Sequence, residues 1–240
     1  MDPLNLHLVC HPSTNPQQIM AGGKGDDMRK LMAVLAIFLA GSAYAETDVS
    51  DLLTKLESEL KEKRPEVLGS LRPPLTASHI AALEEEYRFV LPDAVKALYM
   101  WHDGQDPNGF VTFVNNMQLL PLADALAAKA ELDGMIGYDF ELENWWHPAW
   151  LPIFHNGGGD YLVVDMAGVH SGNRNQLLNF YHDWEYRPIV ANDLRVFVSG
   201  IIDYHAGTSV DDMDEFHSID GFLPDLDISF DAGGTAEPLE

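Results

Sequence analysis

The sequence predicts an α+β fold, in which a central, largely antiparallel sheet is flanked by helices. Helical periodicity dominates residues 48–132, whereas most strand-like apolar runs come later, within residues 150–181. Two of these runs are separated only by Gly157-Gly158-Gly159-Asp160, a pattern typical of a hairpin turn. Helices that come first and strands that pair as hairpins argue against a doubly wound parallel sheet.

The first predicted helix covers residues 48–63. Its apolar residues fall on one helical face: Val49, Leu52, Leu53, Leu56 and Leu60. Arg64-Pro65 ends this helix, because the residue before a proline disfavours the helical backbone. Residues 72–75 then form an extended linker, and Thr76 or Ser78 caps a second helix.

A third helix is predicted to begin at Leu91-Pro92-Asp93 and to stop at His102-Asp103-Gly104. Its inward-facing residues are Val95, Leu98 and Tyr99. The remaining elements are expected to be a strand at 110–114, a helix at 122–132, the hairpin, a strand at 176–181 and a helix at 193–204.

The glycine turn is the most informative part of the chain. Three successive glycines allow positive φ angles and close approach of the backbone, so Gly157, Gly158, Gly159 and Asp160 are predicted to form a structural turn. The run Leu162-Val163-Val164 that follows suits a strand covered on both faces.

Residues 28–45 have the three-part pattern of a secretory signal peptide: a basic start, an apolar run and an A-x-A site before Glu46. The apolar run is too short to span a bilayer, which takes roughly 20 residues. A signal peptide works from the N-terminus, so residues 1–27 are interpreted as a mis-assigned upstream leader. This interpretation predicts a periplasmic or secreted protein that is not inserted in a membrane after cleavage.

Charge narrows the choice of partners. Residues 46–240 hold 11 basic and 35 acidic side chains, which leaves the net charge at the −24 of the whole chain. Such a chain repels nucleic acid and anionic membranes and attracts basic proteins. Its single cysteine, Cys10, lies in the leader, so residues 46–240 have no disulfide, no thiolate zinc site and no cysteine nucleophile.

The acidic residues are concentrated at the end of the chain. No Lys or Arg follows Arg195, whereas residues 196–240 carry eleven Asp or Glu. Residues 205–240 are therefore described as an acidic C-terminal extension, whose end is expected to be mobile. The extension either solubilises the domain or docks a basic partner. In the docking interpretation, the contact residues are Asp211, Asp212, Asp214 and Glu215.

Two patterns suggest chemistry but have simpler explanations. Glu84-Glu85-Glu86 could supply the paired carboxylates of a glycoside hydrolase, but consecutive helical residues point in different directions, which favours a solvated face. Trp101-His102-Asp103 and Tyr181-His182-Asp183 could contribute metal ligands. Neither has the i, i+4 spacing that presents two ligands together, and a role in turns is favoured.

Other catalytic motifs fit poorly. The glycine turn lacks the Lys-Ser/Thr of a phosphate-binding loop, and Ser171 and Ser199 lack the context of a nucleophile elbow. No catalytic residue, cofactor site or metal site is predicted.

The tryptophans before the hairpin have two interpretations. Trp145, Trp146 and Trp150 form an unusually aromatic run, which either packs in the core or leaves one ring exposed as an anchor for a partner. Trp146 and Trp150 are the candidates for partner contact.

The order of these motifs resembles a known family. The residues that carry the resemblance are Leu75-Thr76 with Ile80 and Glu84, Leu91-Pro92-Asp93, Trp150-Leu151-Pro152-Ile153, the glycine turn, Leu162-Val163-Val164-Asp165, His182-Asp183, and Leu194 with Phe197. Over residues 71–204, preceded by the helical segment 46–70, the chain resembles the SUKH superfamily of Smi/Knr-type domains. Bacterial members of that family resemble immunity proteins that neutralise a cognate toxin, and fungal members resemble scaffolds in cell wall signalling.

The resemblance and the charge together predict a non-enzymatic protein-binding domain. The first hypothesis is an exported immunity-type protein that covers the basic or catalytic surface of a toxin. A cell wall scaffold or regulator associated with the envelope is the second hypothesis, and a carbohydrate-active hydrolase is the third.

Overall fold

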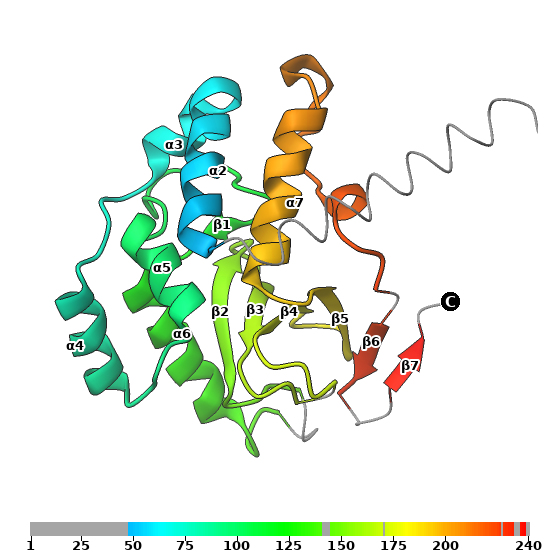
Figure 1. Ribbon diagram of the computed structural model, residues 1–240. Helices are drawn as coiled ribbons and strands as arrows, with labels where there is room; N and C mark the ends of the chain where they lie inside the picture. Colours follow the sequence, from blue (N-terminus) through cyan, green and yellow to red (C-terminus); the bar gives the residue numbers. More distant parts are fainter. Residues whose placement is uncertain (1–47, 141–144, 170, 227, 233–235, 239–240) are drawn as a thin grey trace, which may run out of the picture. The chain divides into compact units, whose positions relative to one another are not determined.

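The computed structural model describes residues 48–140, 145–169, 171–226, 228–232 and 236–238 (Figure 1). The upstream leader and the signal peptide expected at residues 1–45 lie outside these ranges. The predicted α+β fold, with an antiparallel sheet flanked by helices, is confirmed.

The helices of the described chain include the predicted ones and one more. They are α2 (Val49–Lys63), α3 (Pro65–Ser70), α4 (Ala77–Tyr87), α5 (Asp93–Trp101), α6 (Leu122–Met135) and α7 (Leu194–Gly207). Side chains cap three of them, because the oxygens of Asp48, Thr76 and Asp193 accept hydrogen bonds from Ser50 N, His79 N and Val196 N. Thr76, and not Ser78, therefore caps α4. Helix α3 was not expected, although a proline at the first helical position starts a new helix readily.

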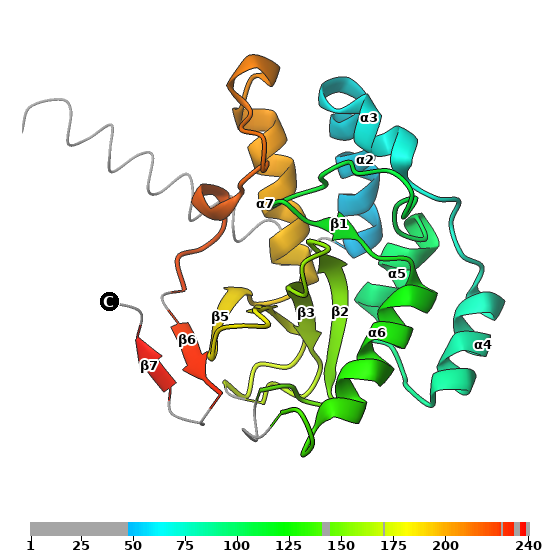
Figure 2. The same ribbon diagram turned by 180° about the vertical axis from the view of Figure 1, so that it is seen from behind.

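The strands form one sheet in chain order, and each pairs antiparallel with the next (Figure 2). They are β1 (Gln118–Leu119), β2 (Trp150–His155), β3 (Tyr161–Asp165), β4 (Gln176–Phe180), β5 (Tyr186–Ala191), β6 (Ile228–Asp231) and β7 (Ala236–Pro238). The predicted hairpin is β2 and β3, in which His155 pairs with Tyr161 across the glycine turn.

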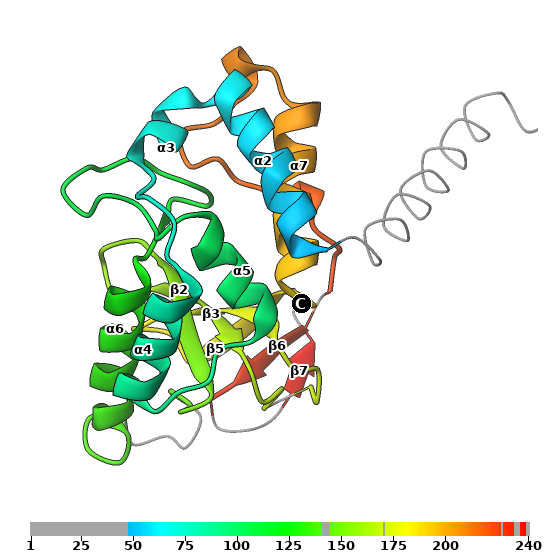
Figure 3. The same cartoon turned by 60° about the vertical axis from the view of Figure 1, so that its left-hand side comes forward.

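Both faces of the sheet are covered, which explains the continuous apolar runs in its strands. One face joins the main core, where α2 packs against α5 and α7 and α6 packs against β2 (Figure 3). Leu151, Ile153 and Val164 point to that side. The alternate residues Trp150 and Val163 point to a second cluster on the other face, as the two-residue period of a strand requires.

Residues 110–114, expected to be a strand, form none, and only Val114 makes an isolated bridge, to Met117. Hydrogen bonds from the side chain of Arg64 take the place of those that a neighbouring strand would make. The buried Arg64 guanidinium donates to the carbonyls of Thr112 and Phe113. Because these backbone acceptors are already satisfied, the segment is held in place without a partner strand. Strand β5 was not foreseen either.

The start of the C-terminal extension is not a free tail. Ile219 is fully buried, and its backbone N–H donates to Asn115 Oδ1 at 2.9 Å. Asn116 N donates to the carbonyl of Phe216 at 2.8 Å. The buried Ile219 and these long-range hydrogen bonds fix the start of the extension to the domain.

Within the described ranges, none of the helices has both the length and the apolar character needed to cross a bilayer.

Candidate partner-binding site

The glycine turn is built around one asparagine. Asn156 Oδ1 accepts hydrogen bonds from Gly158 N at 2.7 Å and Asp160 N at 3.2 Å, and its Nδ2 donates to Asp160 Oδ2 at 2.7 Å. Gly157 and Gly159 have φ angles of 76° and 104°, whereas Gly158 is not in the left-handed region. Strain from a larger residue is therefore expected at the two outer glycines and not at Gly158.

Asp160 also joins two hairpins. Its Oδ1 lies 2.8 Å from His182 Nδ1, in the loop between β4 and β5, and this hydrogen bond raises the pKa of His182. With Asp183, these residues place three possible ligand atoms within 4.8 Å of one another. The imidazole and Asp183 are exposed, and Asp160 already accepts hydrogen bonds from the turn and from His182. The structure explains this cluster by the pairing of Asp160 with His182, which links the glycine turn to the loop between β4 and β5.

Trp146 and Trp150 lie in the core and not on the surface. Their exposed fractions are 1% and 0%, and their rings meet edge to face with centroids 5.6 Å apart. Trp146 Nε1 donates to Asp133 Oδ1 at 2.8 Å, so its polar atom is satisfied inside the domain. Neither side chain can contact a partner of the folded domain, which removes them as anchors.

The other candidate chemical groups have structural partners. Glu84 pairs with Lys96 and accepts a hydrogen bond from Leu91 N at 2.7 Å, so it connects α4 to the start of α5. His102 Nδ1 lies 2.7 Å from the carbonyl of Arg72. Asp103 Oδ1 accepts from Leu122 N at 3.0 Å at the start of α6. These contacts favour the structural interpretation of both patterns.

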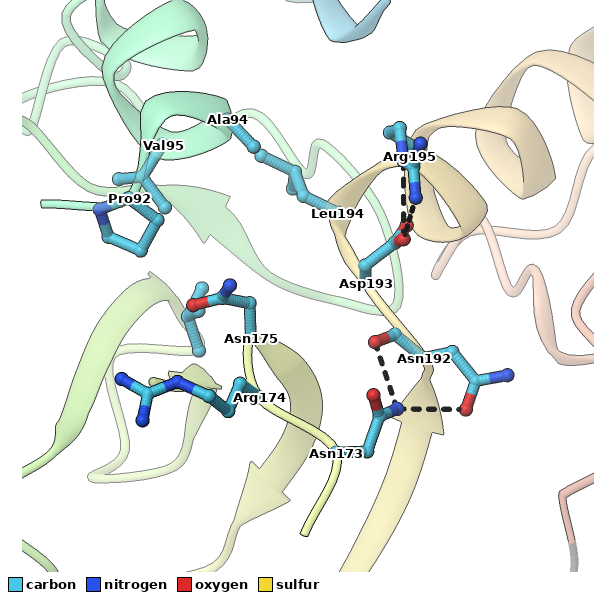
Figure 4. A pocket seen from close by; sticks show the side chains of 11 residues that line it. Pro92, Ala94, Val95, Asn173, Arg174, Asn175, Asn192, Asp193, Leu194 and Arg195 are labelled. Atoms are coloured by element: carbon cyan, nitrogen blue, oxygen red, sulfur yellow. Dashed lines mark hydrogen bonds and ion pairs between the residues drawn. The ribbon is translucent and has the colours of Figure 1, made fainter. Parts of the chain in front are cut away.

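A cleft of about 410 Å³ opens beside the N-termini of α5 and α7 (Figure 4). Its polar lining comprises Asn173, Arg174, Asn175, Asn192, Asp193 and Arg195. The carboxylate of Asp193 caps α7 and pairs with Arg195 at 2.6 Å. The eleven lining residues include no histidine, serine, cysteine or lysine, so the cleft offers amides and guanidinium groups for binding a polar group but no acid–base pair.

The acidic residues predicted to contact a partner lie together on the surface. Residues 210–216, named the acidic segment from here on, follow the end of α7. Asp211, Asp212, Asp214 and Glu215 are all exposed. Asp214 accepts hydrogen bonds from Phe216 N at 2.9 Å and Ser218 N at 3.1 Å, which shape the segment. Asp212 accepts from Ser209 Oγ at 2.6 Å, whereas Asp211 and Glu215 have no hydrogen-bond partner among the described residues.

Apolar side chains are exposed within and beside these carboxylates. Val210 and Phe216 are 57% and 48% exposed. Phe222 is also exposed and packs edge to face on Tyr204 of α7, with centroids 5.5 Å apart. Because the backbone of Phe216 is bonded to Asn116, the segment has a fixed base. Carboxylates among exposed apolar side chains match a partner surface that is both basic and apolar.

The fold is a small α+β domain that presents an exposed acidic segment. The chain belongs to the SMI1 / KNR4 family (SUKH-1), whose model matches residues 74–200. The resemblance noted in the sequence is thereby confirmed. The matched range begins at the linker before α4 and ends within α7.

Fungal proteins are among the relatives. The chain is 24% identical to the "Cell wall assembly regulator SMI1" of Saccharomyces cerevisiae, over 68% of this chain and 42% of that protein. It is 21% identical to the "Glucan synthesis regulatory protein" of Neurospora crassa, over 60% of this chain and 36% of the relative. The "Cell wall biosynthesis/cell cycle regulator smi1" of Schizosaccharomyces pombe is 23% identical, over 78% and 42%. The chain thus spans about two fifths of the length of these relatives.

These relatives overturn one expectation. The predicted periplasmic or secreted location is wrong, because the matched proteins are fungal regulators of wall assembly and glucan synthesis and not periplasmic or secreted proteins. The location had been inferred from residues 28–45 alone, which the structure does not describe.

Proposed function

We propose that this chain is a regulatory protein-binding domain in cell wall assembly, which acts by holding a partner and not by catalysis. Family membership supports this function, and so do the fungal relatives, which are named as regulators. They favour the regulator hypothesis over the toxin-immunity hypothesis, which has no support beyond the resemblance of bacterial members.

The observation that carries the proposal is the acidic segment. It presents Asp211, Asp212 and Glu215 beside the exposed Val210 and Phe216, on a base that is fixed to the domain. The carboxylates speed the encounter with a basic partner, and the apolar side chains contribute once water is excluded. A net charge of −24 extends the attraction beyond the segment, although at 0.15 M salt it is screened over about 8 Å.

The carboxylates of Glu84-Glu85-Glu86 do not support a glycoside hydrolase. Glu84 is engaged with Lys96, and the cleft beside α7 contains no acid–base pair among its lining residues. A binding role uses the features that are present, whereas a glycoside hydrolase would need two carboxyl groups facing one another across a cleft.

A variant that removes negative charges from the acidic segment tests the proposal. Asp211→Asn, Asp212→Asn and Glu215→Gln in one chain remove three carboxylates from the segment. The matched control, Glu62→Gln, Glu85→Gln and Glu86→Gln, makes the same change in net charge on exposed positions of α2 and α4. Each protein would be used to capture partners from the native cell, with quantitative mass spectrometry, and the association rate with the identified partner would be measured against salt.

We expect the segment variant to slow association about tenfold at low salt and the control to slow it much less, because steering depends on charges near the contact. The rate for the unmodified chain should fall as salt rises. Equal behaviour of the two variants, or association that is independent of salt, would contradict the role of the acidic segment.

A further inference from the structure

The loop between β4 and β5 and the start of β5 carry a row of aromatic rings, in which Trp184 is exposed and Tyr181 and Tyr186 are half-buried. Trp184 is 43% exposed, and its ring centroid lies 5.5 Å from that of Tyr181 and 5.1 Å from that of Tyr186. The Trp184 ring is tilted by 54° and 51° against its two neighbours. We name Tyr181, Trp184 and Tyr186 the aromatic ridge. A tryptophan so exposed is a common anchor for binding.

A buried arginine holds the ridge in place from below. Arg187 is fully buried, and its guanidinium donates to the carbonyl oxygens of Trp184, Tyr186 and Trp145. Burial lowers the pKa of Arg187 to about 10, so the group stays charged at neutral pH. No carboxylate of the described residues forms an ion pair with it. Burying the charged Arg187 guanidinium without a carboxylate partner lowers the stability of the domain. In return, its hydrogen bonds to the loop carbonyls hold the loop in one conformation.

The other side of the loop is also tied down. Ala232 N donates to the carbonyl of Glu185 at 2.9 Å, and His182 is bonded to Asp160 of the glycine turn. The ridge is therefore preorganised, which reduces the entropy that a bound side chain would otherwise cost.

The exposed side chains on either side of Trp184 carry negative charge. Asp183 and Glu185 flank Trp184 in sequence, and both are exposed. Neither carboxylate accepts a hydrogen bond from a described side chain. The faces of the aromatic rings are themselves electron-rich, so both features attract a cation.

We propose that the aromatic ridge binds an arginine side chain of the partner. The guanidinium plane lies on the face of Trp184 and donates to the carboxylate of Asp183 or Glu185. This inference rests on the proposed function, since it assigns a contact to the same partner class, a basic protein. It adds a second contact surface to the acidic segment.

Arginine fits better than the other ligands of aromatic surfaces. Its planar guanidinium stacks on rings and pairs with a carboxylate through parallel hydrogen bonds, which the ammonium of lysine does not do. The domain already contains the ring contact of this arrangement, because the guanidinium of Arg187 lies over the rings of Trp145 and Phe180 at 5.0 and 4.6 Å. A neutral glycan or a proline-rich segment would stack on the rings but would carry no positive charge to pair with the carboxylates.

The test uses the full chain and capped pentapeptides of the form Gly-X-Gly-X-Gly, in which X is arginine, citrulline or lysine. Citrulline keeps the shape of arginine and removes its charge. Binding is followed by the shift of the Trp184 indole N–H signal in the nitrogen-15 spectrum, assigned by its loss in Trp184→Phe. We expect a saturable shift with arginine, a weaker shift with lysine and none with citrulline.

Variants locate the contact, and because Trp184→Ala removes the indole signal, binding to all variants is followed by the backbone N–H shifts of residues 181–187 in the same spectrum. Trp184→Ala is expected to weaken arginine-peptide binding about two- to fivefold, the range for an exposed cation–π contact. Asp183→Asn with Glu185→Gln should weaken it by a similar factor. Tyr138→Ala, an exposed aromatic outside the ridge, is the matched control and should have no effect. Equal shifts with arginine and citrulline, or binding that survives Trp184→Ala unchanged, would overturn the assignment.

The native partner separates this inference from the proposed function. If the acidic-segment variant weakens partner binding while Trp184→Ala leaves it unchanged, the ridge is not a contact and the proposed function stands. If Trp184→Ala weakens partner binding while the acidic-segment variant leaves it unchanged, the ridge assignment stands and the role given to the acidic segment in the proposed function fails.

Discussion

Gly104→Ala is expected to destabilise the domain more than any ordinary glycine substitution. Gly104 follows α5 with a φ of 71°, where an alanine is strained. A Cβ built at this position would lie 2.3 Å from Pro121 N and 2.6 Å from the carbonyl oxygen of Leu120. Both are backbone atoms, so no side-chain rotation relieves the overlap. The neighbouring Asp103 caps α6, and Gly104 O accepts from Arg72 N at 2.9 Å, so a shift here disturbs three segments.

The expected loss of stability in Gly104→Ala has two contributions, the strained backbone and the overlap of the added Cβ with its neighbours. The left-handed backbone costs alanine about 1–2 kcal/mol, and a forced overlap in a packed interior costs about 1–3 kcal/mol. Alanine restricts the unfolded chain, which returns about 0.4–1 kcal/mol. The free energy of unfolding should therefore fall by about 1–5 kcal/mol. For a domain of this size, the middle of that range, about 3 kcal/mol, lowers the melting temperature by about 6–12 °C.

Two matched glycines separate the strain from the overlap. Gly157 has a φ of 76° and nothing within 4 Å of the added Cβ, so Gly157→Ala reports the backbone strain alone, about 1 kcal/mol. Gly69 lies in α3, without a positive φ and with open space, and Gly69→Ala should stabilise by about 0.5–1 kcal/mol. Thermal and urea unfolding measure all three. A Gly104→Ala protein as stable as Gly157→Ala would refute the reasoning from the Pro121 overlap.

The other predictions concern the core, the pH dependence and the hairpin. Trp146→Ala should cost about 3–5 kcal/mol of unfolding free energy, because it empties the second core cluster, whereas Trp146→Phe should cost less; urea unfolding would show a surface role instead if both were neutral. Burial lowers the pKa of His217 from 6.5 to about 4, so the unfolded state takes up the proton first and stability falls as pH drops through that interval. His217→Asn, which suits the φ of 51°, should flatten this slope of melting temperature against pH, and an unchanged slope would refute the assignment. Gly159→Val should destabilise more than Gly158→Val in the same assay, because its φ is 104° and its Cβ would lie 3.1 Å from an imidazole ring; the reverse order would contradict the turn geometry.

Much of the fold was predictable because local signals agreed with the tertiary structure. Asp48, Thr76 and Asp193 are capping residues in front of periodic apolar runs, and each caps a helix. The strand predicted at residues 110–114 is wrong, because an apolar run becomes a strand only where a neighbouring strand is available to pair with it. There, the guanidinium of Arg64 satisfies the carbonyls instead, and no pattern in the sequence announces a contact across 48 residues.

The same reasoning explains why the sequence pointed to the wrong tryptophans. Trp146 and Trp150 stand out in an aromatic run, but a run of large apolar residues next to a two-faced strand is what a buried cluster requires. Since helices cover one face of the sheet and the second cluster fills the other, a partner is left with loops and hairpin ends to contact. Trp184 lies in such a loop between two carboxylates, and a tryptophan flanked by charged residues at a turn is the sequence signal that could have nominated it. A buried strand explains the dense aromatic run, whereas core packing does not explain an exposed tryptophan between two carboxylates, which is why we propose Trp184 as the anchor.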